Sequence, residues 1–141
     1  MPEPMAQDEH PARASKVKRL RTRAQFQALL AHRPTARTRH FSLHRLGVSD
    51  AGSNPLFGPS DVTWLGAMVP KRWARRAVTR NAIRRQIHAV GELALAGRGG
   101  AHLIRMHSGF PVSDYPSASS RALKCAVRDE LCVLLGLETA R

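Results

Sequence analysis

The chain has 141 residues, a length that favours one domain, and 23 Lys and Arg side chains against 10 Asp and Glu give it a formal net charge of +13. No stretch approaches the ~18 apolar residues that a membrane span requires, and residues 1–15 lack the apolar segment of a signal peptide. We therefore expect a soluble, cytoplasmic protein. Of the 23 basic residues, 17 lie between Pro11 and Gly91, where Asp50 and Asp61 are the only acids. This asymmetry predicts a polyanionic partner.

The N-terminal part divides into a tail and a first helix. Residues 1–14 are polar and lack periodicity, so we expect a flexible tail before a single domain at residues 15–141. Residues 15–31 are predicted to be helical, with an apolar side made of Leu20, Phe26, Leu29 and Leu30. Ser15 is a candidate cap, but cations in the first turn oppose the helix dipole, and Thr22 is the alternative cap.

Two strands are predicted next. Residues 37–46 alternate, which places His40, Ser42 and His44 on one face and Phe41 and Leu43 on the other. On a strand, His40 and His44 are about 13 Å apart at 3.3 Å per residue, too far to share one ion, so no metal site is expected. Residues 47–61 are rich in Gly, Pro and Ser and predict a loop, whereas residues 62–69 are an apolar run of strand length.

Residues 71–91 contain seven Lys or Arg side chains and no acid, and they predict a loop followed by a strongly basic helix. Thr79 is the predicted cap of this helix. Its apolar face carries Ile83, Ile87, Val90 and Ala94, and a second face carries Arg80, Arg84 and His88, with Asn81 and Arg85 beside it. Like charges at i, i+4 destabilise a helix by a few tenths of a kcal/mol each. We therefore favour a helix face that binds an external anion over a basic face that is only exposed to solvent. A phosphate backbone suits the planar guanidinium groups of arginine.

The remainder reads as a strand at residues 101–107 and a second long helix at residues 118–137. The order helix, strand, strand, helix, strand, helix predicts a single α+β domain with a three- to four-stranded sheet. No catalytic residue is expected, because a metal-dependent nuclease needs several converging carboxylates and the basic region offers only Asp50 and Asp61.

The basic segment resembles the signature of the bacterial ribonuclease P protein family. That signature is a short strand, a Lys/Arg pair, a loop ending in Ala-Val, and an Arg-Asn-x-x-Lys/Arg-Arg run that opens a helix. The matching residues here are Val69, Lys71, Arg72, Ala77, Val78, Arg80, Asn81, Arg84 and Arg85, and the family's opening is matched by Arg19, Leu20, Phe26 and Leu30. The sequence departs from the family at Leu30, which is commonly aromatic, and in the loop, where Ala74, Arg75 and Arg76 replace a frequent glycine. It departs again at His88, usually arginine, so the charge at that position is left open.

The resemblance implies a protein subunit of ribonuclease P, which binds the catalytic RNA and the 5′ leader of precursor tRNA and assists endonucleolytic removal of the leader. It implies that the RNA subunit performs hydrolysis with Mg²⁺ bound mainly by RNA, that no further protein partner and no membrane is required, and that the βαβ crossover is left-handed. The implied RNA-binding residues are Lys71, Arg72, Arg76, Arg80, Asn81, Arg84, Arg85 and His88. The implied leader-binding cleft contains Phe26, Leu30, Phe41, Ser42 and His44.

Two other functions fit part of the sequence. A structural RNA-binding protein, such as a ribosomal component, agrees equally well with the charge and the fold class, and only the Arg-Asn signature and the helix of Phe26 favour ribonuclease P. A DNA-binding module is less suited, because a strand and a loop, rather than a helix and a turn, precede the basic helix.

Overall fold

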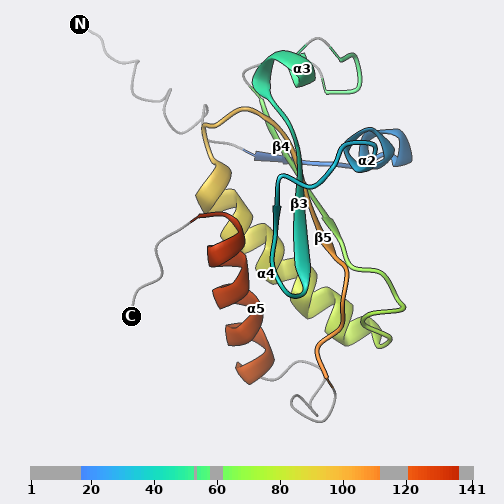
Figure 1. Ribbon diagram of the computed structural model, residues 1–141, viewed down its shortest axis with the longest axis vertical. Coiled ribbons are helices and arrows are strands. Elements are labelled where there is room, and N and C mark those ends of the chain that lie inside the picture. Colours follow the sequence, from blue (N-terminus) through green and yellow to red (C-terminus); the bar gives the residue numbers. More distant parts are fainter. Residues whose placement is uncertain (1–16, 53, 58–61, 112–120, 137–141) are drawn as a thin grey trace, which may run out of the picture.

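The computed structural model describes residues 17–52, 54–57, 62–111 and 121–136, which form one five-stranded sheet in the order β1-β4-β5-β3-β2 (Figure 1). The strands are β1 (Val17–Arg19), β2 (Ala36–Arg37), β3 (Phe41–Leu46), β4 (Thr63–Met68) and β5 (Gly100–Met106). β1, β4 and β5 are parallel, whereas β3 is antiparallel to β5 and β2 to β3. The α+β class is confirmed, but the sheet has five strands instead of three to four. The two edge strands are only three and two residues long, too short to show periodicity.

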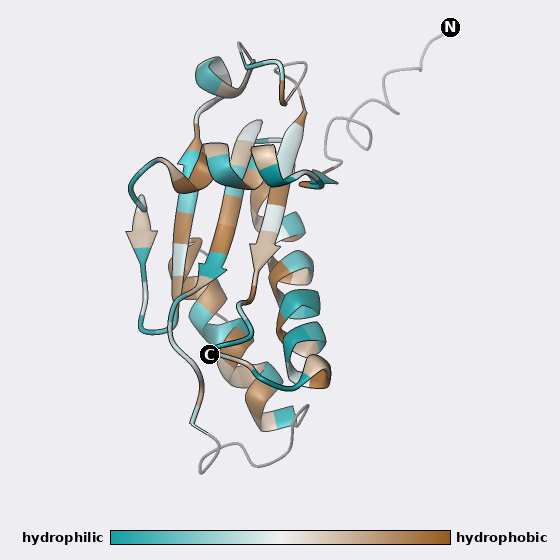
Figure 2. Ribbon diagram, turned by 90° about the vertical axis from the view of Figure 1, so that its right-hand side faces the viewer, coloured by the Kyte–Doolittle hydropathy of each residue, from teal (hydrophilic) through white to brown (hydrophobic). Residues whose placement is uncertain are grey.

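Helices cover both faces of the sheet. α4 (Ala77–Leu95) and α5 (Arg121–Leu134) pack on one face, and α2 (Arg23–Leu30) crosses the other (Figure 2). A short helix, α3 (Val48–Gly52), stands at one end of the sheet within the segment predicted to be a loop. Each face has its own apolar core, because side chains alternate along every strand. The α4/α5 core includes Phe41, Ile83, Ile87, Ile104 and Val127, and the α2 core includes Leu20, Leu29, Phe57 and Leu103.

The helix predicted at residues 15–31 is wrong in its first half, because α2 begins only at Arg23. Val17–Arg19 is strand β1, which pairs in parallel with Thr63 to Leu65 of β4. The helix begins after Thr22, the alternative cap, whose hydroxyl accepts from the Gln25 amide at 3.2 Å. The Gln25 side-chain oxygen accepts in return from the amides of Arg21 and Thr22, which completes a capping box. Lys18, Arg19 and Arg21 thus lie in the strand and the turn before the cap, and Arg23 is the one cation that remains in the first turn of the helix.

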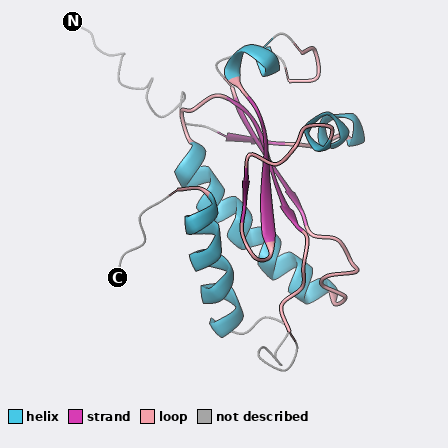
Figure 3. Cartoon of the chain, viewed as in Figure 1, coloured by secondary structure: helices cyan, strands magenta, loops and turns pink. Residues whose placement is uncertain are grey.

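The strand predicted at residues 37–46 is a short hairpin, with a turn at residues 38–40 between β2 and β3 (Figure 3). Glu130 of α5 holds this turn. Its carboxylate accepts from the Thr38 hydroxyl at 2.5 Å, from the His40 amide at 2.6 Å and from His40 Nδ1 at 2.7 Å. The His40 ring stacks on Phe110 with a centroid distance of 3.9 Å. His40 is therefore a buried structural residue.

The basic helix α4 connects the adjacent parallel strands β4 and β5. All four apolar positions predicted to face the core, Ile83, Ile87, Val90 and Ala94, are buried. A Cβ on Gly91 would lie 2.6 Å from Leu65 Cδ2, so this glycine allows α4 to approach β4 closely. The predicted cap at Thr79 is wrong, since α4 begins at Ala77 and its N-cap is Arg76, three residues before Thr79. The left-handed sense of the crossover stays a prediction from the resemblance.

Candidate nucleic-acid interface

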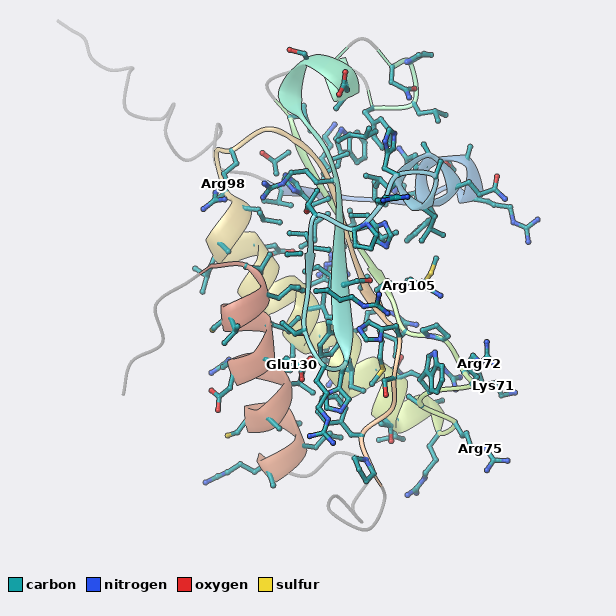
Figure 4. All side chains as sticks on the ribbon, viewed as in Figure 1. Lys71, Arg72, Arg75, Arg98, Arg105 and Glu130 are labelled. Atoms are coloured by element: carbon teal, nitrogen blue, oxygen red, sulfur yellow. The ribbon has the colours of Figure 1, made fainter. Side chains whose placement is uncertain are left out.

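The loop before α4 carries exposed cations at one end of the molecule. Lys71, Arg72, Arg75 and Arg76 are all exposed. The first three project outward from the same end, on the far side from α3 (Figure 4). The Arg72 guanidinium lies 5.1 Å from the centroid of the Trp73 ring, close enough for a cation–π contact that limits its motion. The loop therefore presents several positive charges in a defined arrangement.

The first turn of α4 adds to this positive potential. It contains no acid, and its N-cap Arg76 makes no side-chain hydrogen bond to the helix. The amide groups of the first turn and the positive end of the helix dipole thus remain available to an anion. Arg80 has a structural task here, since its Nη1 donates to the carbonyl oxygens of Ala74 at 3.1 Å and Arg75 at 2.8 Å. Arg80 fixes the loop against the helix that follows it.

A depression of about 480 Å³ lies between β1 and the outer face of α4. Its lining residues are Arg19, Asn81, Arg84, Arg85, His88, Ala89 and Glu92. Arg84 Nη1 donates to Asn81 Oδ1 at 3.1 Å, and the Asn81 amide nitrogen has no hydrogen-bond partner among the described residues. Arg19 Nη2 lies 3.7 Å from Glu92 Oε2, and both side chains are well exposed, so this ion pair is weak. Three guanidinium groups and one carboxylate make the depression cationic.

His88 differs from its prediction. Its helical spacing predicts a place on the outer row with Arg80 and Arg84, but it is only 8% exposed, and its Nδ1 has no hydrogen-bond partner among the described residues. Burial, together with the positive charges of Arg19 and Arg84, lowers the pKa of His88 to about 4. The imidazole is therefore neutral at pH 7 in the free protein. In this state it offers an anion a hydrogen bond and no charge.

The residues expected to form a leader-binding cleft are only partly brought together. Phe26 and Leu30 lie on α2, partly buried against the core of that face. Ser42 and His44 share the same sheet face but are 2% and 4% exposed, and His44 Nδ1 donates to the His32 carbonyl oxygen at 2.9 Å. The prediction for Phe41 is wrong, because this ring is fully buried in the opposite core, between the sheet and the helices α4 and α5.

Arg19 belongs to the cationic depression, although the sequence did not indicate this. The sequence predicts Arg19 in the first helix, whereas β1 places it next to the outer face of α4. The parallel pairing of Arg19 with Leu65 spans 46 positions of the chain, and no local pattern indicates such a contact. The family opening that includes Arg19 and Leu20 was the one signal available.

These surfaces define a class of protein: an α+β fold with one cationic helix and a cationic loop before it, a surface suited to a polyanion such as a nucleic acid. Among the described residues, no helix is long and apolar enough to cross a membrane. The sequence model of the family described as Ribonuclease P matches residues 14–111. The chain belongs to the ribonuclease P protein family.

Curated relatives agree with this assignment. The chain is 35% identical over 125 residues to the ribonuclease P protein component of Ralstonia pickettii, covering 88% of this chain and 81% of the relative. It is 32% identical over 121 residues to the same component of Paraburkholderia xenovorans, covering 85% and 79%. The expected function, a protein subunit of the endoribonuclease ribonuclease P that acts in tRNA processing, is confirmed. The ribosomal alternative is not favoured.

Solved structures support the fold. The ribonuclease P protein of Staphylococcus aureus superposes with a TM-score of 0.60 at 17% identity, over 86% of this chain and 94% of that one. A mutant of the same protein, described as defective in mRNA degradation activity, superposes with a TM-score of 0.58 over 95% and 96%. At this low identity the likeness concerns the fold alone.

Proposed function

We propose that the outer face of α4 and the loop before it bind the RNA subunit of ribonuclease P, and that the sheet face beside α2 binds the 5′ leader of precursor tRNA. The observation that carries the proposal is the cationic depression between β1 and α4, where Arg19, Arg84 and Arg85 meet a single carboxylate. A surface of this kind is electrostatically unfavourable alone and is stabilised when phosphates displace its counterions. An A-form RNA helix or loop offers such phosphates at close spacing.

Each part of this face has a separate task. Arg84 and Arg85 neutralise phosphates, and the amide of Asn81 donates to an RNA oxygen while its own oxygen stays with Arg84. His88 contributes a neutral ring at the floor of the depression, so its contact with RNA is a hydrogen bond that does not depend on pH near neutrality. Lys71, Arg72 and Arg76 extend the cationic surface toward the beginning of α4.

The leader side supplies apolar surface. Phe26 and Leu30 of α2 remain partly exposed and pack against the same core as Trp64 and Met68, which are also only partly buried. Unstacked bases gain ~1–3 kcal/mol each on aromatic side chains without regard to sequence. That tolerance suits an enzyme whose precursor substrates carry different leaders. Ser42 and His44 take part only if a movement of their neighbours uncovers them, since both are almost fully buried.

Hydrolysis is assigned to the RNA subunit. Within the described part of the chain, no group of three or more His, Cys, Asp or Glu side chains could hold a metal ion. As the family resemblance implies, Mg²⁺ would be bound mainly by the RNA subunit, and this chain would supply no catalytic residue and need no further protein partner. The protein contributes by neutralising charge and by holding the substrate, in the cytoplasm, where tRNA precursors are processed.

Reconstitution tests the proposal directly. The purified protein is mixed with a bacterial ribonuclease P RNA and a precursor tRNA at a magnesium concentration too low for the RNA alone. Leader removal that requires both macromolecules is the expected result. Tight RNA binding without any rescue of cleavage would contradict it and would revive the interpretation as a structural RNA-binding protein.

A further inference from the structure

We propose that Arg105 and Arg37 form a phosphate-binding position on the sheet face beside α2, where they hold the sugar–phosphate backbone of the leader. The inference rests on the proposed function and adds to it a second, purely electrostatic contact with the substrate. It begins with the register of the sheet. Arg105 of β5 pairs with Met68 of β4 on one side and with Ser42 of β3 on the other, and Ser42 pairs with Arg37 of β2.

Residues paired across neighbouring strands project to the same face, so these four side chains form one row across the sheet. Met68 packs at the edge of the core beneath α2, whereas Ala36, the neighbour of Arg37, packs on the opposite core. Both observations place the row on the α2 face. Arg105 and Arg37 lie two strands apart, roughly 10 Å between their Cα atoms at ~4.8 Å per strand.

The row lies just outside the part of the sheet that α2 covers. The buried apolar residues beneath α2 belong to the two rows before it, those of Leu46 with Ala101 and of His44 with Leu103. Ser42, between the two arginines of the proposed row, is also buried. Figure 2 shows α2 crossing one half of the strands and leaving the other half uncovered on this side. Figure 4 shows Arg105 projecting to the side of α2, away from α4 and α5, with Lys71 and Arg72 farther along the same side.

Neither guanidinium is neutralised within the described residues. Arg37 is exposed and Arg105 is partly buried, and no hydrogen bond or ion pair joins either side chain to a described residue. Among the described carboxylates, Glu130 of α5 lies at the turn that follows Arg37, but it binds Thr38 and His40 and not the guanidinium. Glu92 on α4, Asp129 on α5 and Asp50 on α3 form no ion pair with either arginine within the described residues. Arg105 is partly buried on a central strand and has no carboxylate partner among the described residues, so an anion from outside would stabilise it.

The geometry favours a single RNA strand as the source of that anion. Arg105 occupies the sheet surface between α2, with its apolar residues Phe26 and Leu30, and the loop that carries Lys71 and Arg72. A strand that stacks its bases toward α2 would pass its phosphates over the row of Arg105 and Arg37. The two planar forks suit phosphate oxygens, and they carry no preference for base sequence.

The test compares two leaders and three proteins. Holoenzyme is reconstituted with wild-type protein, with the double variant Arg37→Met and Arg105→Met, and with Arg128→Met, which removes an exposed charge from α5 on the opposite face. Each is assayed on precursor tRNA whose leader has either natural phosphodiester or uncharged methylphosphonate linkages, and on mature tRNA. The affinity for precursor tRNA is taken from the dependence of the single-turnover cleavage rate on holoenzyme concentration. The affinity for mature tRNA, which is not cleaved, is taken from its competition with precursor tRNA.

The double variant is expected to bind the natural precursor about tenfold more weakly than wild type, with mature tRNA unaffected and Arg128→Met unchanged. The slope of log affinity against log salt should fall by ~0.7 for each phosphate that the variant no longer neutralises. On the methylphosphonate leader the wild type and the double variant should become equal.

Several outcomes would overturn the inference. An undiminished wild-type affinity for the methylphosphonate leader excludes a phosphate contact, whether or not the double variant folds. A difference between variant and wild type that persists on the uncharged leader shows that the two arginines act on bases or on packing. Wild-type holoenzyme that cannot remove a natural leader contradicts instead the proposed function, so the two failures are distinguishable.

Discussion

Replacing Glu130 by alanine removes the acceptor of the three hydrogen bonds that join α5 to the turn between β2 and β3. These bonds measure 2.5, 2.6 and 2.7 Å, and the side chains of His40 and Glu130 are only 10% and 15% exposed. A hydrogen bond to a charged group contributes about 1.5–3 kcal/mol, and part of this is recovered when Thr38 and His40 bind water. We expect the free energy of unfolding to fall by about 3 kcal/mol, within the range for breaking a buried pair.

The same interaction has a pH signature. Burial alone raises the pKa of Glu130, but hydrogen bonds from the Thr38 hydroxyl and from the side chain and amide of His40 outweigh it and bring the pKa below its ordinary value of 4.5. A carboxyl group with a lowered pKa in the folded state stabilises the fold above its unfolded pKa and loses this effect as the pH falls. Glu130→Gln should therefore reduce the stability at pH 7 and lessen its decline below about pH 4.5.

Urea unfolding followed by circular dichroism measures both effects. At pH 7 the alanine variant should also unfold at a temperature roughly 10 °C lower than wild type. Asp129→Ala, a change of the exposed neighbouring carboxylate, serves as the control and should stay within about 0.5 kcal/mol of wild type. If Glu130→Ala is as stable as this control, the turn is held by packing on Phe110 and the reasoning from hydrogen bonds is refuted.

Three further predictions concern RNA binding and stability. Arg84→Ala with Arg85→Ala should weaken binding of ribonuclease P RNA for all sequences alike and lower the salt slope by about 1 for each phosphate left without its arginine, whereas Arg128→Ala should not; filter binding at several salt concentrations decides between them. Phe26→Ala should weaken binding of precursor tRNA by ~1–3 kcal/mol more than that of mature tRNA, and equal reductions would show that Phe26 only packs against the core. Burial, opposed by the hydrogen bond to the Gly99 carbonyl oxygen and assisted by the charges of Arg45 and Arg98, lowers the pKa of His102 to about 4. Only the unfolded chain then binds this proton between about pH 6.5 and 4, so the free energy of unfolding should decrease as the pH is lowered through that window. The decrease should be less steep in His102→Gln. Urea midpoints that change in parallel for both proteins would argue against this.

The features determined by sequence alone are those carried by local patterns. The apolar face of α4 follows from a spacing of three and four residues, which any helix turns to one side, and all four predicted positions are buried. The absence of acids from residues 71–91 predicted the cationic surface, because charge composition does not depend on the fold. The Thr22 cap was recognisable because capping involves residues only three positions apart. The Arg-Asn spacing indicated the family without knowledge of any tertiary contact.

The tertiary structure decided what depends on partners distant in the chain. β1 forms because Val17–Arg19 pairs with β4. This pairing places Arg19 in the cationic depression and not in the predicted helix. The same packing buries His88 and keeps it neutral, although its helical spacing places it in line with Arg80 and Arg84. The hydrogen bonds between Glu130 and His40 span 90 positions, and the row of Arg37 and Arg105 exists only through the pairing of three strands. The exposure and the charge state of a side chain depend on the residues that pack around it. In this protein many of those residues are distant in the sequence, so local patterns do not reveal them.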